Sequence, residues 1–198
     1  MALRDSIMAL DIPLPERGEL PEDLQKYFAI CEEKLGMLPN VLAAYSHDAE
    51  QLRTFSKFYN VLMFGDSGLS PLEREMIAVV VSSCNHCFYC LTAHGSAVRD
   101  YSGDPAFGEL LVMNYRAGDL SARHRAMLDF AVKVTELSYE IEESDRQALR
   151  DAGFSEKDIW DIANVAGFYN MTNRVASAVD MQPNEEYHAA HRTAPTGN

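Results

Sequence analysis

Helix-start signals recur along this chain, and they constrain its fold more than any other feature. Ser70 is followed by Pro71 and then by Glu73, which supplies an N-cap, a proline at the first helical position and a capping box. Ser155 heads a similar box, and Ser121 precedes another run of helically spaced apolar residues. No segment shows sustained alternation of apolar and polar residues, so the sequence predicts an all-α protein.

The run from Met76 to Val81 is the one stretch with the length and composition of a β-strand. The capped helix that starts at Ser70 runs directly into it, so we predict a buried helix here. This run is also the longest apolar run of the chain, and at six residues it is far too short to span a bilayer.

The sequence divides into an arm, a domain and a tail. Residues 1–20 are interrupted by prolines and predict an irregular N-terminal arm. Residues 21–180 predict a single helical domain, with one helix ending at Gly36 and a break near Asp48. Residues 181–198 are polar and predict a C-terminal tail that is an arm or disordered. A chain of 198 residues is long enough for one domain with a real core.

Charge and composition narrow the classes of partner. The formal net charge is −13 and the pI is near 4.8, which argues against nucleic acid and against anionic membrane surfaces, because phosphate binding needs a basic face. The N-terminus lacks the basic-then-apolar pattern of a secretory signal. We therefore expect a cytoplasmic protein, where a pair of closely spaced cysteines is more often catalytic or metal-binding than structural.

Three of the four cysteines lie in one short stretch together with a histidine. Cys87 and Cys90 are three residues apart, which is one helical turn and a spacing that a disulfide can bridge. His94 follows, about 40° from Cys90 and about 20° from Cys87 at 100° per residue. Two thiols and an imidazole therefore share one stripe of one predicted helix, which is a redox or metal-binding arrangement.

A redox couple follows from the chemistry of thiols near a helix start. We expect one helix to end near Ser83 and the next to begin near His86, with Cys87 in its first turn. The helix N-terminus and the imidazole both favour thiolate over thiol, and the second thiol can then close a disulfide. If the two helices pack as a hairpin, Glu75 can orient His94 or accept its proton. The alternative for Glu75 is a solvated carboxylate in the first turn of its helix.

Other interpretations of the cluster stay open from the residues alone. Cys84, Cys87, Cys90 and His94 offer four metal ligands, but along one helix they fan over about 120°, which is awkward for a tetrahedral site. Cys84 is predicted to be an inert buried thiol or a second resolving thiol. Cys31 lies among apolar residues and is predicted to pack in the core.

The pattern Glu75-x11-Cys87-x2-Cys90-x3-His94 resembles the active-site signature of the alkylhydroperoxidase D family, within the carboxymuconolactone decarboxylase superfamily. Outside this core, residues 128–135, 151–155 and 170–176 are similar to segments of the branch called peroxidase-related enzymes. The resemblance covers about residues 20–180. It implies an alkylhydroperoxidase D-like helical bundle with the CxxC at the start of a central helix.

The resemblance also implies an activity and its requirements. The expected activity is thiol-dependent reduction of hydroperoxides, with no cofactor or metal and with electrons from an external dithiol, either a donor protein or a small thiol. In the family mechanism the residue at the place of Cys90 attacks the peroxide and that of Cys87 resolves it, while His94 and Glu75 relay protons. Helix-dipole reasoning alone favours Cys87 as the attacking thiol, so the residues leave this assignment open.

Self-association into dimers, trimers or hexamers is a further implication of the resemblance. It agrees with residues 55–64, whose apolar side chains cover most of a helical circumference, so that the helix should be buried on two sides. Two other functions remain as alternatives: a decarboxylase of the same superfamily acting on a lactone acid, and a redox-sensing or metal-binding helical oligomer without turnover.

Overall fold

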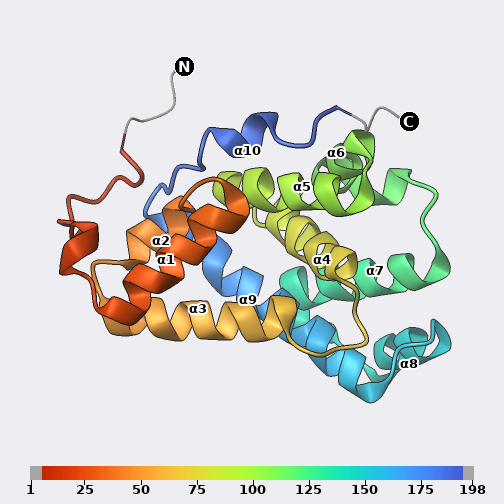
Figure 1. The fold of residues 1–198 in the computed structure, drawn as a ribbon. Helices are drawn as coiled ribbons and strands as arrows, with labels where there is room; N and C mark the ends of the chain where they lie inside the picture. Colours follow the sequence, from red (N-terminus) through yellow and green to blue (C-terminus); the bar gives the residue numbers. More distant parts are fainter. Residues whose placement is uncertain (1–5, 194–198) are drawn as a thin grey trace.

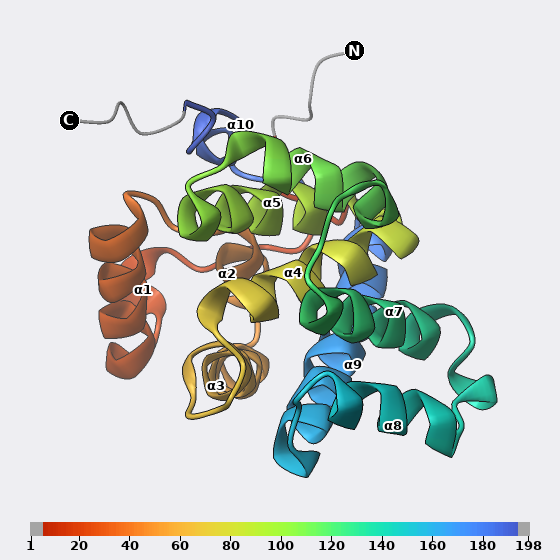
Figure 2. The same ribbon diagram turned by 90° about the vertical axis from the view of Figure 1, so that its right-hand side faces the viewer.

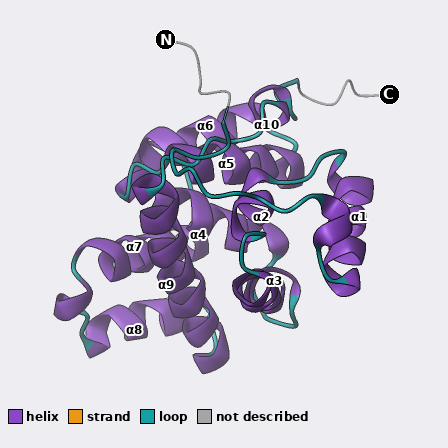
Figure 3. Cartoon of the chain, turned by 90° about the vertical axis from the view of Figure 1, so that its left-hand side faces the viewer, coloured by secondary structure: helices purple, strands orange, loops and turns teal. Residues whose placement is uncertain are grey.

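The computed structural model describes residues 6–193, and within them the chain forms helices joined by turns and loops, with no strand (Figures 1 and 3). The all-α prediction is confirmed. The helices are α1 (Glu22–Leu35), α2 (Asn40–Tyr45), α3 (Ala49–Phe64), α4 (Pro71–Cys84), α5 (Phe88–Ser102), α6 (Pro105–Asn114), α7 (Ala122–Glu136), α8 (Glu143–Asp151), α9 (Glu156–Ala178) and α10 (Glu186–Ala189), with 3-10 turns η1 (Arg17–Glu19), η2 (Tyr115–Ala117) and η3 (Ser138–Glu140). In the described chain, none of these helices has the length and apolar character needed to cross a membrane.

Helix α4 is the centre of the molecule. It packs against α3, α5, α6, α7 and α9, and Figure 2 shows it between the α5–α6 pair above and helices α7 to α9 below. From Met76 to Val81 no residue is more than 1% exposed, so this run is the buried helix that the sequence predicts. Because every face of α4 is covered, the groups at its two ends are held in fixed positions by the core.

The predicted caps form as hydrogen-bonded boxes. Ser70 Oγ accepts from the Glu73 amide at 3.1 Å, and a Glu73 carboxylate oxygen accepts from the Ser70 amide at 2.8 Å. The box at Ser155 forms in the same way at the start of α9. The predicted break falls between α2 and α3, where Asp48 caps α3, and α1 ends at Gly36 with a φ of 73°.

Both ends of the chain pack on the domain, and they do so side by side. The Ala9 amide donates to the Val179 carbonyl at 2.8 Å, and the Gln182 amide donates to the Ile7 carbonyl at 2.9 Å. Residues 6–16 form neither helix nor strand, and Met8 among them is buried. Residues 1–5 lie outside the described part of the arm.

Residues 181–193, for which the sequence predicts a polar arm or a disordered tail, pack on the domain in this structure. Met181 is buried, and α10 lies along α5 (Figure 1). The reason is a buried cation: the Arg99 guanidinium on α5 donates to the carbonyls of Tyr187 at 2.9 Å and Ala190 at 3.0 Å. Backbone carbonyls of the tail are therefore among the groups that fix it, and residues 194–198 lie outside the described structure.

Helix α3 is buried on one side only within this chain. Leu52 and Met63 face the core and are almost fully buried, whereas Val61 is 60% exposed and Phe64 is 62% exposed. The apolar circumference predicted for this helix thus leaves an uncovered outer face.

Candidate active site

The turn between α4 and α5 sets the position of the two thiols. Helix α4 ends at Cys84, and His86 then takes the left-handed conformation, with a φ of 53°. The Cys87 amide donates to the Ser82 carbonyl at 3.0 Å, which closes the turn. Cys87 is therefore the N-cap of α5, one position before the first turn in which it was predicted, and Cys90 lies inside that turn. His86 is exposed, and its backbone conformation is what the turn requires.

The two thiols are buried and in contact. Cys87 is 1% exposed and Cys90 is 3% exposed, and both are reduced in this structure. The Cys90 amide donates to Cys87 Sγ at 3.5 Å, which is the capping bond of the helix. This contact places the pair within reach of a disulfide, because cysteines one turn apart need little backbone movement to bridge.

The two thiols of this pair differ in their pKa. A hydrogen bond from the Cys90 thiol, helped by the Cys90 amide, lowers the pKa of Cys87 to about 7 although burial opposes the shift. The same hydrogen bond, together with burial, raises the pKa of Cys90 well above its ordinary value. Cys87 is therefore the thiol of the pair that ionises more readily near neutral pH.

Glu75 and His94 meet because α5 turns back across α4. Glu75 Oε2 lies 2.7 Å from His94 Nδ1, and both side chains are largely buried. The interpretation of Glu75 as a solvated carboxylate is therefore wrong, and the hairpin arrangement holds. With Nδ1 bound to the carboxylate, His94 keeps Nε2 for proton exchange.

Tyr169 on α9 completes the environment of the imidazole. Its hydroxyl oxygen lies 3.4 Å from His94 Nδ1, and the two rings meet edge to face with centroids 4.7 Å apart. Tyr169 is fully buried, and burial and the Glu75 carboxylate raise the pKa of its phenol well above its ordinary value. The sequence suggests only a core or pocket aromatic at this position, because nothing local to Tyr169 indicates a partner 75 residues away.

Apolar side chains from both ends of the chain cover the thiols. Met8 and Met181 belong to the same buried cluster as Cys87 and Cys90, together with small residues of α2, α5 and α9. The pair consequently lies in an apolar, closed environment in which a charge–dipole interaction is stronger than in water.

The other two cysteines have a raised pKa, and one of them also lies in a different part of the fold. Cys84 is half-buried at the end of α4, where burial and the nearby Glu136 carboxylate raise its pKa to about 11. Cys31 is on α1 beside Tyr27, in a separate apolar cluster, and burial raises its pKa as well. Both thiols stay protonated at neutral pH, so neither is an activated nucleophile.

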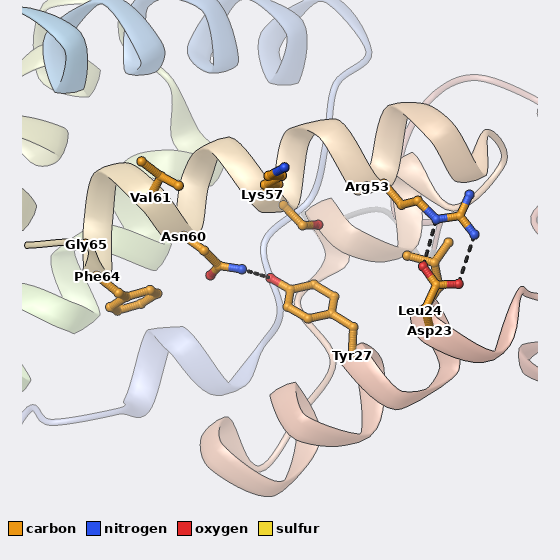
Figure 4. Close-up of a pocket in the computed structure, with 10 residues that line it drawn as sticks. Asp23, Leu24, Tyr27, Arg53, Lys57, Asn60, Val61, Phe64 and Gly65 are labelled. Carbon is orange, nitrogen blue, oxygen red and sulfur yellow. Dashed lines mark hydrogen bonds and ion pairs between the residues drawn. The ribbon is translucent and has the colours of Figure 1, made fainter.

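A surface cleft of about 610 Å³ between α1 and α3 lies away from this chemistry (Figure 4). Asn60 donates to the Tyr27 hydroxyl at 3.4 Å inside it, and Arg53 pairs with Asp23 at its edge. No cysteine or histidine lines this cleft, so we do not assign it to the active site. Among residues 6–193, no three His, Cys, Asp or Glu side chains are arranged to hold a metal ion.

Known proteins resemble this chain in both sequence and fold. The model of the carboxymuconolactone decarboxylase family matches residues 49–106, which include Glu75, both thiols and His94. An uncharacterized peroxidase-related protein from Silicibacter sp. TM1040 is 62% identical, with a TM-score of 0.93 over 97% of this chain and 100% of that one. None of the curated protein sequences matches this chain significantly.

Two further solved structures share the fold. The alkylhydroperoxidase AhpD core of an uncharacterized peroxidase-related protein from Ralstonia eutropha JMP134 is 38% identical, with a TM-score of 0.92 over 96% of this chain and 100% of that one. The debrominase Bmp8, solved with 2,3,4-tribromopyrrole, has a TM-score of 0.79 over 93% of this chain and 97% of that one. Bmp8 is only 19% identical, and its likeness concerns the fold alone.

Proposed function

Because the chain belongs to the carboxymuconolactone decarboxylase family, on its alkylhydroperoxidase D-like side, we propose that it reduces hydroperoxides with the Cys87–Cys90 pair and an external dithiol. The observation that carries this proposal is a buried pair of cysteines in contact, in which the pKa of Cys87 is lowered to about 7. The same helix carries His94, whose imidazole is bound to the Glu75 carboxylate. Inert structural cysteines need neither a shared charge nor a positioned imidazole.

The proposed reaction balances with these groups alone. A thiolate attacks the terminal peroxide oxygen, the O–O bond breaks, and the products are a cysteine sulfenic acid and an alkoxide. His94 gives the alkoxide a proton and regains one from solvent, while Glu75 holds the imidazole in place. The other thiol then displaces the hydroxyl of the sulfenic acid as water and forms the Cys87–Cys90 disulfide.

An external dithiol returns the pair to its reduced state by two exchanges. Its first thiolate breaks the Cys87–Cys90 bond and forms a mixed disulfide with one of the two cysteines. Its second thiolate then attacks the mixed disulfide, which forms the disulfide of the donor and releases that cysteine as a thiol. Two electrons thus pass from the dithiol to the peroxide in each cycle. The resting charge lies on Cys87, whereas the family resemblance assigns the attack to Cys90, so the charge has to move to Cys90 before the attack.

A consumption assay tests the proposal. Purified protein is mixed with an organic hydroperoxide and several dithiols, one small and one a protein with a CxxC pair, and the loss of peroxide is followed. We expect turnover that Cys90→Ser and Cys87→Ser each abolish, while Cys31→Ser, the matched control, leaves it intact. A disulfide that forms without turnover with any dithiol would contradict the proposal and favour a redox sensor.

A further inference from the structure

A fully buried asparagine lies beneath the thiol pair. Asn173 on α9 is 0% exposed, and its Nδ2 donates to Ser82 Oγ on α4 at 2.9 Å. Its Oδ1 accepts from Asn85 Nδ2 at 2.9 Å. A buried amide needs partners for both its ends, and here these partners come from α4 and from the α4–α5 turn.

The direction of this network is fixed at its outer end. Arg174 donates to Asn170 Oδ1 at 2.7 Å, and Asn170 Nδ2 donates to the Ala166 carbonyl at 3.0 Å. A guanidinium can only donate and a carbonyl can only accept, so the Asn170 amide cannot be reversed. Asn85 must then present its Nδ2 to both Asn170 Oδ1 and Asn173 Oδ1, which turns the Asn173 amide nitrogen inward.

The inward end of the network reaches Cys90. The side chains of Asn173 and Ser82 both favour the thiolate form of Cys90, and so they oppose the effect of burial on its pKa. The Ser82 hydroxyl also lies 2.6 Å from the Ala78 carbonyl, so its single proton has two acceptors. A thiolate is the stronger acceptor of the two, and a rotation of the hydroxyl transfers the hydrogen bond to it.

We propose that Asn173 and Ser82 form a donor cradle that holds negative charge on Cys90, and that this cradle lets the Cys90 proton pass to the Cys87 thiolate before the attack on peroxide. The proton leaves Cys90 sulfur and arrives on Cys87 sulfur, so the charge of the pair is unchanged. Both are positioning residues, since they act through Cys90. This inference rests on the proposed function, which needs a thiolate at Cys90.

No cationic side chain is among the titratable groups named here around Cys90, so neutral donors have to stabilise a negative charge on its sulfur. Cys87 and Tyr89 face it from the start of α5, Tyr169 faces it from α9, and the His94–Glu75 pair lies one turn further along. Burial raises the pKa of both tyrosines, so they stay neutral. The Asn173 amide and the Ser82 hydroxyl are consequently the neutral groups that favour a negative charge on the Cys90 sulfur.

The test isolates Cys90 and needs no peroxide. In a Cys87→Ser background, the alkylation rate of Cys90 is measured against pH for Ser82→Ala and for Ser83→Ala. Ser83 is the matched control, because it is the next residue of α4 but donates to the Val112 carbonyl. We expect Ser82→Ala to move the titration of Cys90 to higher pH and to lower its alkylation near pH 8 about tenfold.

A second variant pair guards against a folding artefact. Asn173→Leu removes the buried donor, and its control Asn164→Leu changes an amide of the same helix that donates only to the Trp160 carbonyl. Circular dichroism establishes that each variant is folded. Equal pH profiles for Ser82→Ala and Ser83→Ala would overturn the cradle even if peroxide turnover is present. If the pH profile of Cys90 alkylation shifts in Ser82→Ala but the protein shows no peroxide turnover, the cradle is supported and the proposed function is contradicted.

Discussion

Glu75 Oε2 and His94 Nδ1 are 2.7 Å apart, in two helices that the chain places side by side by one tight turn. This contact gives the imidazole a single orientation and fixes which of its nitrogens is free. A structural ion pair at the same place would stabilise the fold but would leave thiol reactivity unchanged. The following prediction separates these two roles.

We expect His94→Ala to lower the alkylation rate of the thiol pair near neutral pH, because the imidazole contributes to the low pKa of Cys87. Glu75→Gln should act in the same direction but more weakly, since a carboxylate that orients the imidazole is one step removed. The measurement is iodoacetamide labelling followed by mass spectrometry, with thermal unfolding as a check on folding. Unchanged rates in both variants would make the pair structural.

The pH dependence of labelling should differ among the four cysteines. Only the thiolate reacts, so the Cys87 rate should rise through its pKa of about 7 and level off above it. Cys84, with a pKa of about 11, should react only in alkaline solution, and Cys31 should also lag. Peptide mapping at several pH values checks this order. A Cys87 profile that rises only near the Cys84 profile would refute the shared charge.

Mild oxidation should join Cys87 and Cys90 in one intramolecular disulfide. The Cys90 amide already donates to Cys87 Sγ at 3.5 Å, whereas Cys31 lies in a separate cluster. Non-reducing peptide mapping after one equivalent of hydrogen peroxide should show this bridge, with Cys31 still open to alkylation. Cys31→Ser serves as the control and should oxidise like the parent. A map with Cys31 bridged and Cys87 free would count decisively against the redox pair.

Arg74→Met should destabilise the fold by about 3 kcal/mol. The Arg74 guanidinium is buried and donates to the carbonyls of Leu69, Leu62 and Gly65, which belong to the end of α3 and the loop before α4. Methionine leaves these acceptors without a donor. Urea unfolding measures the loss, and Arg146→Met, at an exposed ion pair, is the control that should cost far less. Equal losses would mean that the loop is held by other contacts.

The uncovered face of α3 predicts self-association. Val61 and Phe64 are exposed on it, and burying such a face against a second copy would remove apolar area from water. Light scattering at micromolar concentration should give at least twice the chain mass of 22.1 kDa. The double variant Val61→Glu and Phe64→Glu should lower the mass toward that of a monomer. A parent protein that is already monomeric would show that this face stays in solvent.

Local signals in the sequence were enough for the helices and for half of the site. The box at Ser70 and the break at Asp48 depend on side chains within three residues of each other, so spacing reveals them. The contact between Glu75 and His94 could also be anticipated. The two residues lie on consecutive helices, and consecutive helices joined by a short turn commonly pack against each other.

The remaining parts of the site depend on contacts that no spacing encodes. Tyr169 and Asn173 belong to α9, which contacts α4 and α5 although three helices separate it from α5 along the sequence. The packing of the tail on the domain could not be read from the sequence, for a related reason. Arg99 binds it through carbonyls, which every residue carries, so the partner leaves no mark in the composition of the tail.

The pairing of residues 7–9 with residues 179–182 has a kinetic consequence. Two backbone hydrogen bonds join these segments, and their Met8 and Met181 share one buried cluster with the two thiols, while a separate, larger core lies among helices α3 to α9. Separating these two segments from each other costs far less than unfolding the domain. The rate at which a reactant reaches the thiols is then the product of two terms. One is the fraction of time that the two segments are separated, and the other is the encounter rate with exposed thiols. Hydrogen exchange at the Ala9 and Gln182 amides reports that same fraction, so one equilibrium between closed and frayed ends sets both numbers.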